Sequence, residues 1–196
     1  RPLGAGTTVL QTHFTHAVNY NDLESVRYIC RRFPVAALIT EPLLQNIGVV
    51  KPKRGYLEGL RALADELGFL LVFDEVKTGF RHALGGYSQL CGVKPDLVVY
   101  GKAMANGFPL AAVAGKAKYM DSIIDPDPAR RPFVAGTCNG HPVAVAAAIE
   151  TLRYLIANKE TLYPRREAMG AAMEAGIMGI LARRGITACV ARQGSA

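Results

Sequence analysis

Two short apolar segments, each ending on an ionisable residue, constrain the fold of this chain most. Residues 69–73 (FLLVF) lead into Asp74, and residues 97–101 (LVVYG) lead into Lys102. Runs this short, rich in Val, Leu and aromatic residues, are typical of strands buried on both faces in a parallel sheet covered by helices. In such sheets ligands bind beyond the carboxyl ends of the strands. We therefore expect Asp74 and Lys102 to share one crevice.

A third apolar segment, residues 35–40 (VAALIT), ends on Glu41. Before this segment, Asn21-Asp22 can cap a helix that ends at residues 31–34. Between the first two strands, residues 55–68 place their apolar side chains at helical spacing and finish on Gly68, a common stop signal. The order strand, helix, strand predicts a right-handed crossover unit. The fold class predicted is α/β, with a mainly parallel sheet flanked by helices and with Glu41 at the third strand end.

The second half of the chain continues this pattern. A Gly-rich turn region, residues 79–92, is expected to cross the mouth of the crevice, a loop is expected at 103–109, a further strand at 110–115 and another loop at 121–135. One helix is predicted from Pro142 through residue 155, and its N-terminus could hold a phosphate. A second helix at about 162–183 and a possible strand at 186–191 follow. We divide the chain into a large domain at 1–158 and, at 159–196, a linking helix with the start of a small C-terminal domain.

Charge and composition exclude several classes of partner. The 23 Lys and Arg against 16 Asp and Glu give a net charge of +7, but the basic residues are scattered in pairs without an aromatic-basic motif, so we expect no nucleic acid. No window is apolar and long enough to span a membrane, and we see no signal peptide, so a cytoplasmic location is expected. The four cysteines form no CxxC pair, and His13 and His16 lack the HExxH arrangement; we expect no metal site.

A lysine and an aspartate at neighbouring strand ends suggest a particular chemistry. A lysine facing a cleft can form a Schiff base with a carbonyl, and an aspartate can keep a pyridine nitrogen protonated. Pyridoxal phosphate needs these two groups and a phosphate cradle. Spacing alone leaves open that Asp74 and Lys102 are only polar groups of a cleft or an ion pair.

Four segments together carry a family resemblance: ITEPLLQNIG at 39–48, LVFDEVKTGFR at 71–81, GVKPDLVVYGK at 92–102 and AGTCNGHP at 135–142. In this order they resemble the class III aminotransferases, which depend on pyridoxal phosphate and have PLP fold type I, and among them most the glutamate-1-semialdehyde 2,1-aminomutase branch. The likeness runs over about residues 17–190. It implies the large domain of that fold, and amino-group transfer on an amino acid or an amino-aldehyde or amino-ketone.

The resemblance also implies roles for individual residues. Lys102 would form the Schiff base with pyridoxal phosphate and move the proton, Asp74 would pair with the pyridinium nitrogen, and Val76 would pack on the ring. Thr137 would bind the cofactor phosphate, typically that of the partner subunit in a homodimer. Glu41 would lie near the ring, or else simply cap its strand end. Small-molecule amino donors and acceptors would be the other partners.

Four further positions qualify the resemblance. Many ω-aminotransferases carry a second Glu at the position of Asn46. This chain has Asn there, like the aminomutase branch. Lys77 takes a place near the cofactor often held by Gln or Met. Tyr87 is expected at the surface or, alternatively, at the substrate. Glu75 is expected to give structural support beside Asp74.

Two other readings stay open. The family's upstream phosphate turn and stacking aromatic residue, and most of its small domain, are absent, so we expect this chain to be part of a longer protein. A catalytically inactive fragment or scaffold of a PLP-fold protein is therefore one alternative. A dinucleotide-dependent oxidoreductase is the other, and the absence of GxGxxG after any strand argues against it.

Overall fold

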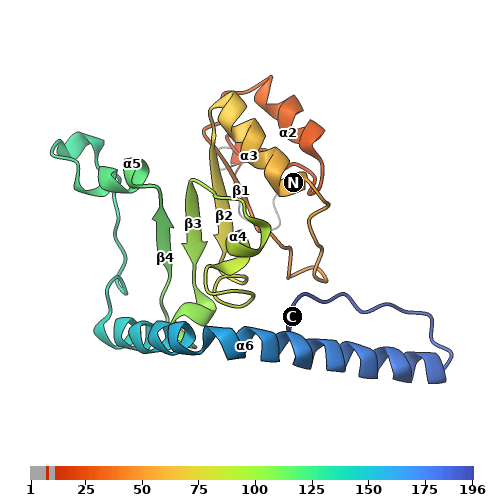
Figure 1. Cartoon of the computed structure of the whole chain (residues 1–196). Helices are drawn as coiled ribbons and strands as arrows, with labels where there is room; N and C mark the ends of the chain where they lie inside the picture. Colours follow the sequence, from red (N-terminus) through yellow and green to blue (C-terminus); the bar gives the residue numbers. More distant parts are fainter. Residues whose placement is uncertain (1–7, 9–11) are drawn as a thin grey trace.

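The computed structural model describes residue 8 and residues 12–196. The elements follow one another along the chain as shown in Figure 1. They are α2 (Leu23–Cys30), β1 (Ala37–Thr40), α3 (Tyr56–Leu67), β2 (Leu70–Glu75), α4 (Gly86–Cys91), β3 (Leu97–Tyr100), the 3-10 helix η1 (Lys102–Ala105), β4 (Ala112–Gly115), α5 (Ala117–Met120), the 3-10 turns η2 (Asp121–Ile124) and η3 (Pro128–Arg130), and α6 (Pro142–Arg183).

The sheet has the order β1-β2-β3-β4, and its first three strands are parallel. Val72 of β2 pairs with Ile39 of β1 and with Leu97 of β3. The fourth strand, predicted at 110–115, runs antiparallel to β3. The prediction of an α/β fold with a mainly parallel sheet is confirmed. The loop predicted at 103–109 begins instead with the short helix η1.

Both helices predicted in the first half form with the expected ends. Asp22 caps α2, where its Oδ1 accepts hydrogen bonds from the backbone N–H groups of Glu24 at 3.0 Å and Ser25 at 3.1 Å. Gly68 ends α3 with a φ of 78°, a left-handed conformation that glycine adopts without steric cost. Asp22 thus fixes where α2 begins, and Gly68 fixes where α3 stops, just before β2.

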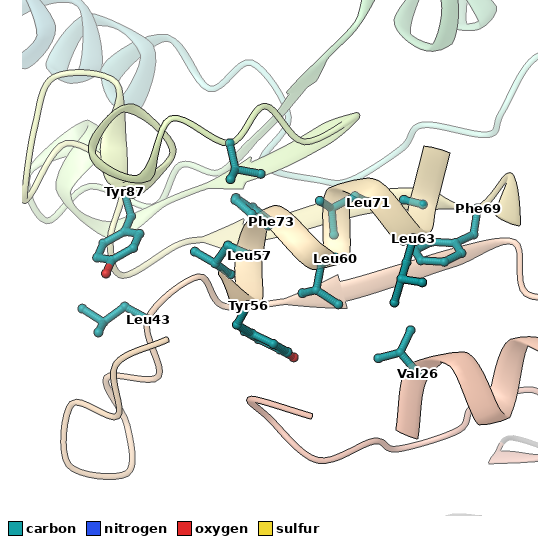
Figure 2. Packing of buried hydrophobic residues seen from close by; sticks show 12 residues of the cluster. Val26, Leu43, Tyr56, Leu57, Leu60, Leu63, Phe69, Leu71, Phe73 and Tyr87 are labelled. Carbon is teal, nitrogen blue, oxygen red and sulfur yellow. The ribbon is translucent and has the colours of Figure 1, made fainter. Parts of the chain in front are cut away.

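The main core lies between these helices and one face of β2 (Figure 2). Burial alternates along β2, so that Leu71 and Phe73 are fully buried beneath Leu57 and Leu60 of α3. Fully burying one such side chain stabilises the fold by about 1.5–3 kcal/mol. This core holds the strand that carries Asp74 on its other face.

That other face of the sheet differs from the prediction. Ile39 on β1 is 65% exposed and Val113 on β4 is 55% exposed, and no helix among the described residues covers them. The expectation that the strands are buried on both faces is therefore wrong for the described chain. The apolar composition of the strands indicated a two-sided core, but α2 and α3 supply only one covering layer.

The C-terminal part also differs from the prediction. Residues 142–183 form one continuous 42-residue helix, α6, where two helices were expected. Residues 156–163 contain no glycine or proline to end it, and α6 continues through Pro164 although a proline removes one backbone hydrogen bond. The strand suggested at 186–191 does not form. This segment returns along α6 instead (Figure 1), held by Arg192, which pairs with Glu167 at 2.7 Å and Glu174 at 2.8 Å.

The described helices and strands do not test the division at residue 158, which stays a prediction. Within residues 12–196, no helix is long and apolar enough to cross a membrane.

Candidate active site

Three predicted site residues lie at the carboxyl ends of the parallel strands. Thr40 of β1 pairs with Phe73 of β2, and Glu41 and Asp74 each follow directly on that pair. Lys102 opens η1 just beyond β3, and η1 contacts α6 (Figure 1). The sheet therefore brings Glu41, Asp74 and Lys102 to one edge, as the strand-end pattern predicted.

Asp74 has one carboxylate oxygen that is free to accept a hydrogen bond from a ligand. Its side chain is half-buried and shares a sheet face with its register partner Val99 and with Val113. Oδ1 accepts a hydrogen bond from the backbone N–H of Val76 at 3.0 Å, whereas Oδ2 has no hydrogen-bond partner among the described residues. The first bond fixes the carboxylate orientation and leaves the second oxygen for a ligand.

Val76 lies close to the backbone just before Lys102. A Cβ atom added to Gly101 would lie 3.3 Å from Cγ1 of Val76, which is tighter than most real contacts. Gly101 itself is extended, with a φ of −168°. The missing side chain lets the end of β3 approach the turn after β2, and so places Lys102 near Val76.

Lys102 is exposed and lines an open cleft of about 820 Å³. Its φ of 38° falls in the left-handed region, and two other residues of the cleft, Phe80 and Asn106, have φ values of 60° and 47°. Left-handed backbone costs a non-glycine residue roughly 1–2 kcal/mol. Strain of this kind concentrates at functional sites, where the surrounding structure holds it in place. The cleft is completed by Arg81, Ala103, Gly107, Phe108, Pro109, Leu110, Leu155, Arg166 and Ser195.

Glu75 gives structural support next to Asp74, as expected. It is fully buried, and its carboxylate accepts hydrogen bonds from Thr78 Oγ1 at 2.9 Å, from the backbone N–H groups of Tyr87 at 2.6 Å and Ser88 at 2.9 Å, and from Ser88 Oγ. A side chain at Gly86, which has a φ of 73°, would collide with this carboxylate. Glu75 thus ties the end of β2 to the N-terminal turn of α4.

Tyr87 belongs to the core and lies neither at the surface nor at the cleft. It is 9% exposed and packs near Leu43 (Figure 2). The Gly-rich turn region, which was expected to cross the mouth of the crevice, contains the helix α4, and Glu75 binds the start of that helix. The prediction of a surface or substrate-contacting tyrosine is wrong.

Glu41 begins a polar chain that the sequence did not reveal. Its Oε2 accepts from the backbone N–H of Gln45 at 3.5 Å, and the side-chain amide of Gln45 lies 3.0 Å from Nε2 of His82. Nδ1 of His82 is buried without a hydrogen-bond partner. Burial, together with the charges of Arg166 and Arg81, lowers the pKa of His82 to about 4, so the imidazole is neutral at physiological pH. Gln45 lies in the segment 39–48 and His82 directly follows the segment 71–81, but the sequence analysis assigned neither residue a role.

Lys77 and Asn46, two positions that the sequence analysis singled out, contact each other. The ammonium group of Lys77 donates a hydrogen bond to Oδ1 of Asn46, which lies in the loop after β1. A glutamate at position 46 would place a carboxylate against this lysine. The pair therefore joins the loops that follow β1 and β2.

Thr137 lies apart from the other predicted residues. It stands in the loop before α6, in which every residue from 131 to 141 is exposed. Among the described residues its side chain has no hydrogen-bond partner, and no group of three potential metal ligands occurs there or elsewhere in residues 12–196. Its phosphate-binding role stays a prediction.

Comparison with known proteins places this arrangement in a family. The sequence model of the class-III aminotransferases matches residues 8–195. The chain belongs to the class-III aminotransferase family. It is 41% identical over 196 residues to a glutamate-1-semialdehyde 2,1-aminomutase of Acidobacterium capsulatum, covering 99% of this chain and 45% of that relative.

Solved structures of transaminases share the fold. An ω-transaminase from Sphaerobacter thermophilus superposes with a TM-score of 0.89 at 29% identity, over 98% of this chain and 44% of that one. A transaminase with PLP bound superposes with a TM-score of 0.87 at 28% identity, over 97% of this chain and 45% of that one. The chain thus spans somewhat less than half the length of the class-III proteins it matches.

Proposed function

We propose that the protein containing this chain carries out pyridoxal-phosphate-dependent amino-group transfer on an amino acid or an amino-aldehyde or amino-ketone. The observation that carries the proposal is the strained Lys102 on the cleft, at the same sheet edge as an Asp74 carboxylate with one free oxygen. Membership in the class-III family and the PLP-bound solved relative support it. An inactive scaffold is not favoured.

The residues present fit this cofactor. Bound pyridoxal phosphate would supply an electron sink for a substrate that has lost a proton. The free oxygen of Asp74 would accept a hydrogen bond from the pyridinium nitrogen and keep that nitrogen protonated. Val76, fixed by the hydrogen bond between its N–H and Asp74, would support the ring. The amine of Lys102 would hold the cofactor covalently and then carry a proton at the substrate carbon.

The intramolecular form of the reaction has a specific observation in its favour. The relative at 41% identity is a glutamate-1-semialdehyde 2,1-aminomutase. Asn46, which contacts Lys77, stands where many ω-aminotransferases carry a glutamate. We therefore rank an aminomutase ahead of an aminotransferase that passes the amine to a second molecule. A cytoplasmic homodimer that shares its active sites completes the proposal.

The first prediction tests the lysine. In the whole protein, Lys102→Ala should abolish covalent attachment of pyridoxal phosphate after borohydride reduction, because among the described residues Lys102 is the lysine that lines the cleft. Absorbance spectra and peptide mapping measure the attachment. Lys118→Ala on α5 is the matched control and should leave attachment to Lys102 intact. An adduct mapped to another lysine in the wild type would overturn the proposal.

A further inference from the structure

The cleft that holds Lys102 carries two arginines that the sequence analysis did not assign. Arg81 follows Phe80 in the turn region after β2, and Arg166 projects from α6. No aspartate or glutamate lines this cleft. Three cationic side chains therefore line the cleft, and no anionic side chain of the described residues faces them.

Arg166 is held in place by α6 and the turn. Its guanidinium donates hydrogen bonds to the backbone carbonyl of Arg81 and, at 2.8 Å, to Oγ of Ser195. One turn of helix earlier, Tyr163 donates to the carbonyl of Phe80 at 3.1 Å. These bonds fix the turn against α6 and fix Arg166 beside it.

Arg81 is different because its guanidinium has no partner. Its side chain is half-buried, and it forms no ion pair or hydrogen bond with any described residue. Glu167, the acidic residue adjacent to Arg166 on α6, is engaged by Arg192 at 2.7 Å. Burial and the charge of Arg81 lower the pKa of Arg166, which means that the two guanidinium groups repel each other. An anion between them would remove that repulsion.

The walls of the cleft restrict what this anion can be. Phe80, Phe108, Leu110 and Leu155 give it apolar sides, which suit the carbon chain of a small molecule. Guanidinium groups match carboxylates with two parallel hydrogen bonds. We infer that Arg81 and Arg166 bind a carboxylate of the substrate whose amine or carbonyl group reacts at Lys102. This inference rests on the proposed function and narrows its preferred substrates to acids, which should react faster than simple amines.

The test measures binding of glutarate, a dicarboxylate without an amine, to the cofactor-loaded whole protein by titration calorimetry. Loss of a charge-assisted contact should weaken glutarate binding by about ten-fold or more in Arg81→Gln. Arg165→Gln, a neighbouring exposed arginine of α6 outside the cleft, should bind glutarate as the wild type does. Arg81→Lys should recover only part of the affinity, because an ammonium cannot form the two-pronged contact.

A kinetic arm uses a pair of amines that differ by one carboxylate. In single-turnover reactions, Arg81→Gln should slow bleaching of the cofactor band by 4-aminobutyrate about ten-fold while leaving that by butylamine unchanged. Arg166→Gln should act in the same direction, with its melting temperature recorded because Arg166 also holds the turn.

Three outcomes would overturn the inference: no saturable glutarate binding by the wild type, equal binding by wild type and Arg81→Gln, or displacement of glutarate by inorganic phosphate at equal concentration. The last would assign the arginines to a phosphate group. Glutarate binding does not depend on attachment at Lys102, so a protein that binds glutarate without a Lys102 adduct refutes the proposed function alone. A protein with the adduct but no glutarate binding refutes only the carboxylate site.

Discussion

At the scale of single residues, the side chain that shapes the site most is Glu75. Its carboxylate has no exposure to water, and it accepts bonds from Thr78, Tyr87 and Ser88. Those bonds set the turn that carries Phe80 and Arg81 into the cleft. Asp74, one residue earlier in β2, lies on the opposite face of the sheet because side chains alternate along a strand.

Glu75→Gln should therefore destabilise the protein by about 1–3 kcal/mol, since an amide removes one acceptor and adds two buried donors without partners. Urea unfolding of the whole protein measures the change. Glu58→Gln on the exposed side of α3 is the matched control and should stay within about 0.5 kcal/mol of the wild type. A Glu75 variant as stable as this control would show that the four bonds contribute little.

Single residues also show how far the sequence could predict this site. Asp74, Glu41 and Lys102 were identifiable because each ends an apolar run, and strand ends meet at one edge of a parallel sheet. Tyr87, Gln45 and Arg81 were not, because their positions depend on how the turn folds around Glu75. That turn is determined by hydrogen bonds between residues far apart in the chain, which periodicity does not report.

At the scale of elements, Asp96 joins three of them at the opposite end of the sheet. The residue is buried, and its carboxylate accepts from Lys116 Nζ at 2.6 Å, from Arg61 of α3 at 2.8 Å, and from the backbone N–H of Leu71 in β2 at 2.9 Å. Burial alone would raise the pKa of Asp96, but these bonds outweigh it and lower the pKa to about 2. The carboxylate is thus ionised while the protein is folded.

This pKa predicts a loss of stability in acid. Asp96 binds its proton more weakly in the folded than in the unfolded state, so its contribution is fully present above about pH 4 and is lost as pH falls toward about 2. The contribution is on the order of 2 kcal/mol. Asp96→Asn should lower the free energy of unfolding at pH 7 by at least this amount and flatten its dependence on pH between 4 and 2.

The matched control for Asp96 is Asp65→Asn. Asp65 binds the same Arg61 at 2.8 Å, but its side chain is 67% exposed, and pairs at the surface contribute about 0–1 kcal/mol. Urea unfolding across this pH range compares the two variants. Equal acid sensitivity of Asp96→Asn and the wild type would show that Asp96 does not link these elements.

The elements differ in how well the sequence specified them. The caps Asp22 and Gly68 and the apolar spacing of α3 act locally, so the first two helices and the strands were predicted. The continuity of α6 was not, because the helices predicted at 142–155 and at about 162–183 were treated as separate. The helix continues there while Tyr163 and Arg166 bind the turn after β2.

At the scale of the whole molecule, residue 8 and residues 12–196 supply no covering layer for one face of the sheet. Asp74 lies on that face together with the exposed Val113, so the candidate site opens toward it. Apolar sheet faces are stable when they pack against another layer. The chain spans 44–45% of the length of the relatives compared above. The apolar composition of its strands is typical of a sheet that is covered on both faces.

The exposed loop before α6 offers a second surface of this kind. Phe133 is 95% exposed and Val134 is 62% exposed, four and three residues before Thr137. An aromatic side chain at full exposure beside a predicted phosphate ligand suits an interface between two subunits, where aromatic residues contribute much of the binding energy. The proposed homodimer would place this loop at the partner's site.

Phe133→Ser should then weaken dimerisation of the whole protein by about ten-fold or more, because truncating a buried interface aromatic typically costs more than 1 kcal/mol. Sedimentation velocity over a dilution series measures the dissociation constant. Phe14→Ser is the matched control: Phe14 is 89% exposed but lies outside the loop, so its removal should leave the dissociation constant unchanged. Cofactor retention should fall with the dimer fraction in Phe133→Ser, since Thr137 would reach the phosphate only across the interface. A variant that stays dimeric with full cofactor retention would place Thr137 away from the shared site.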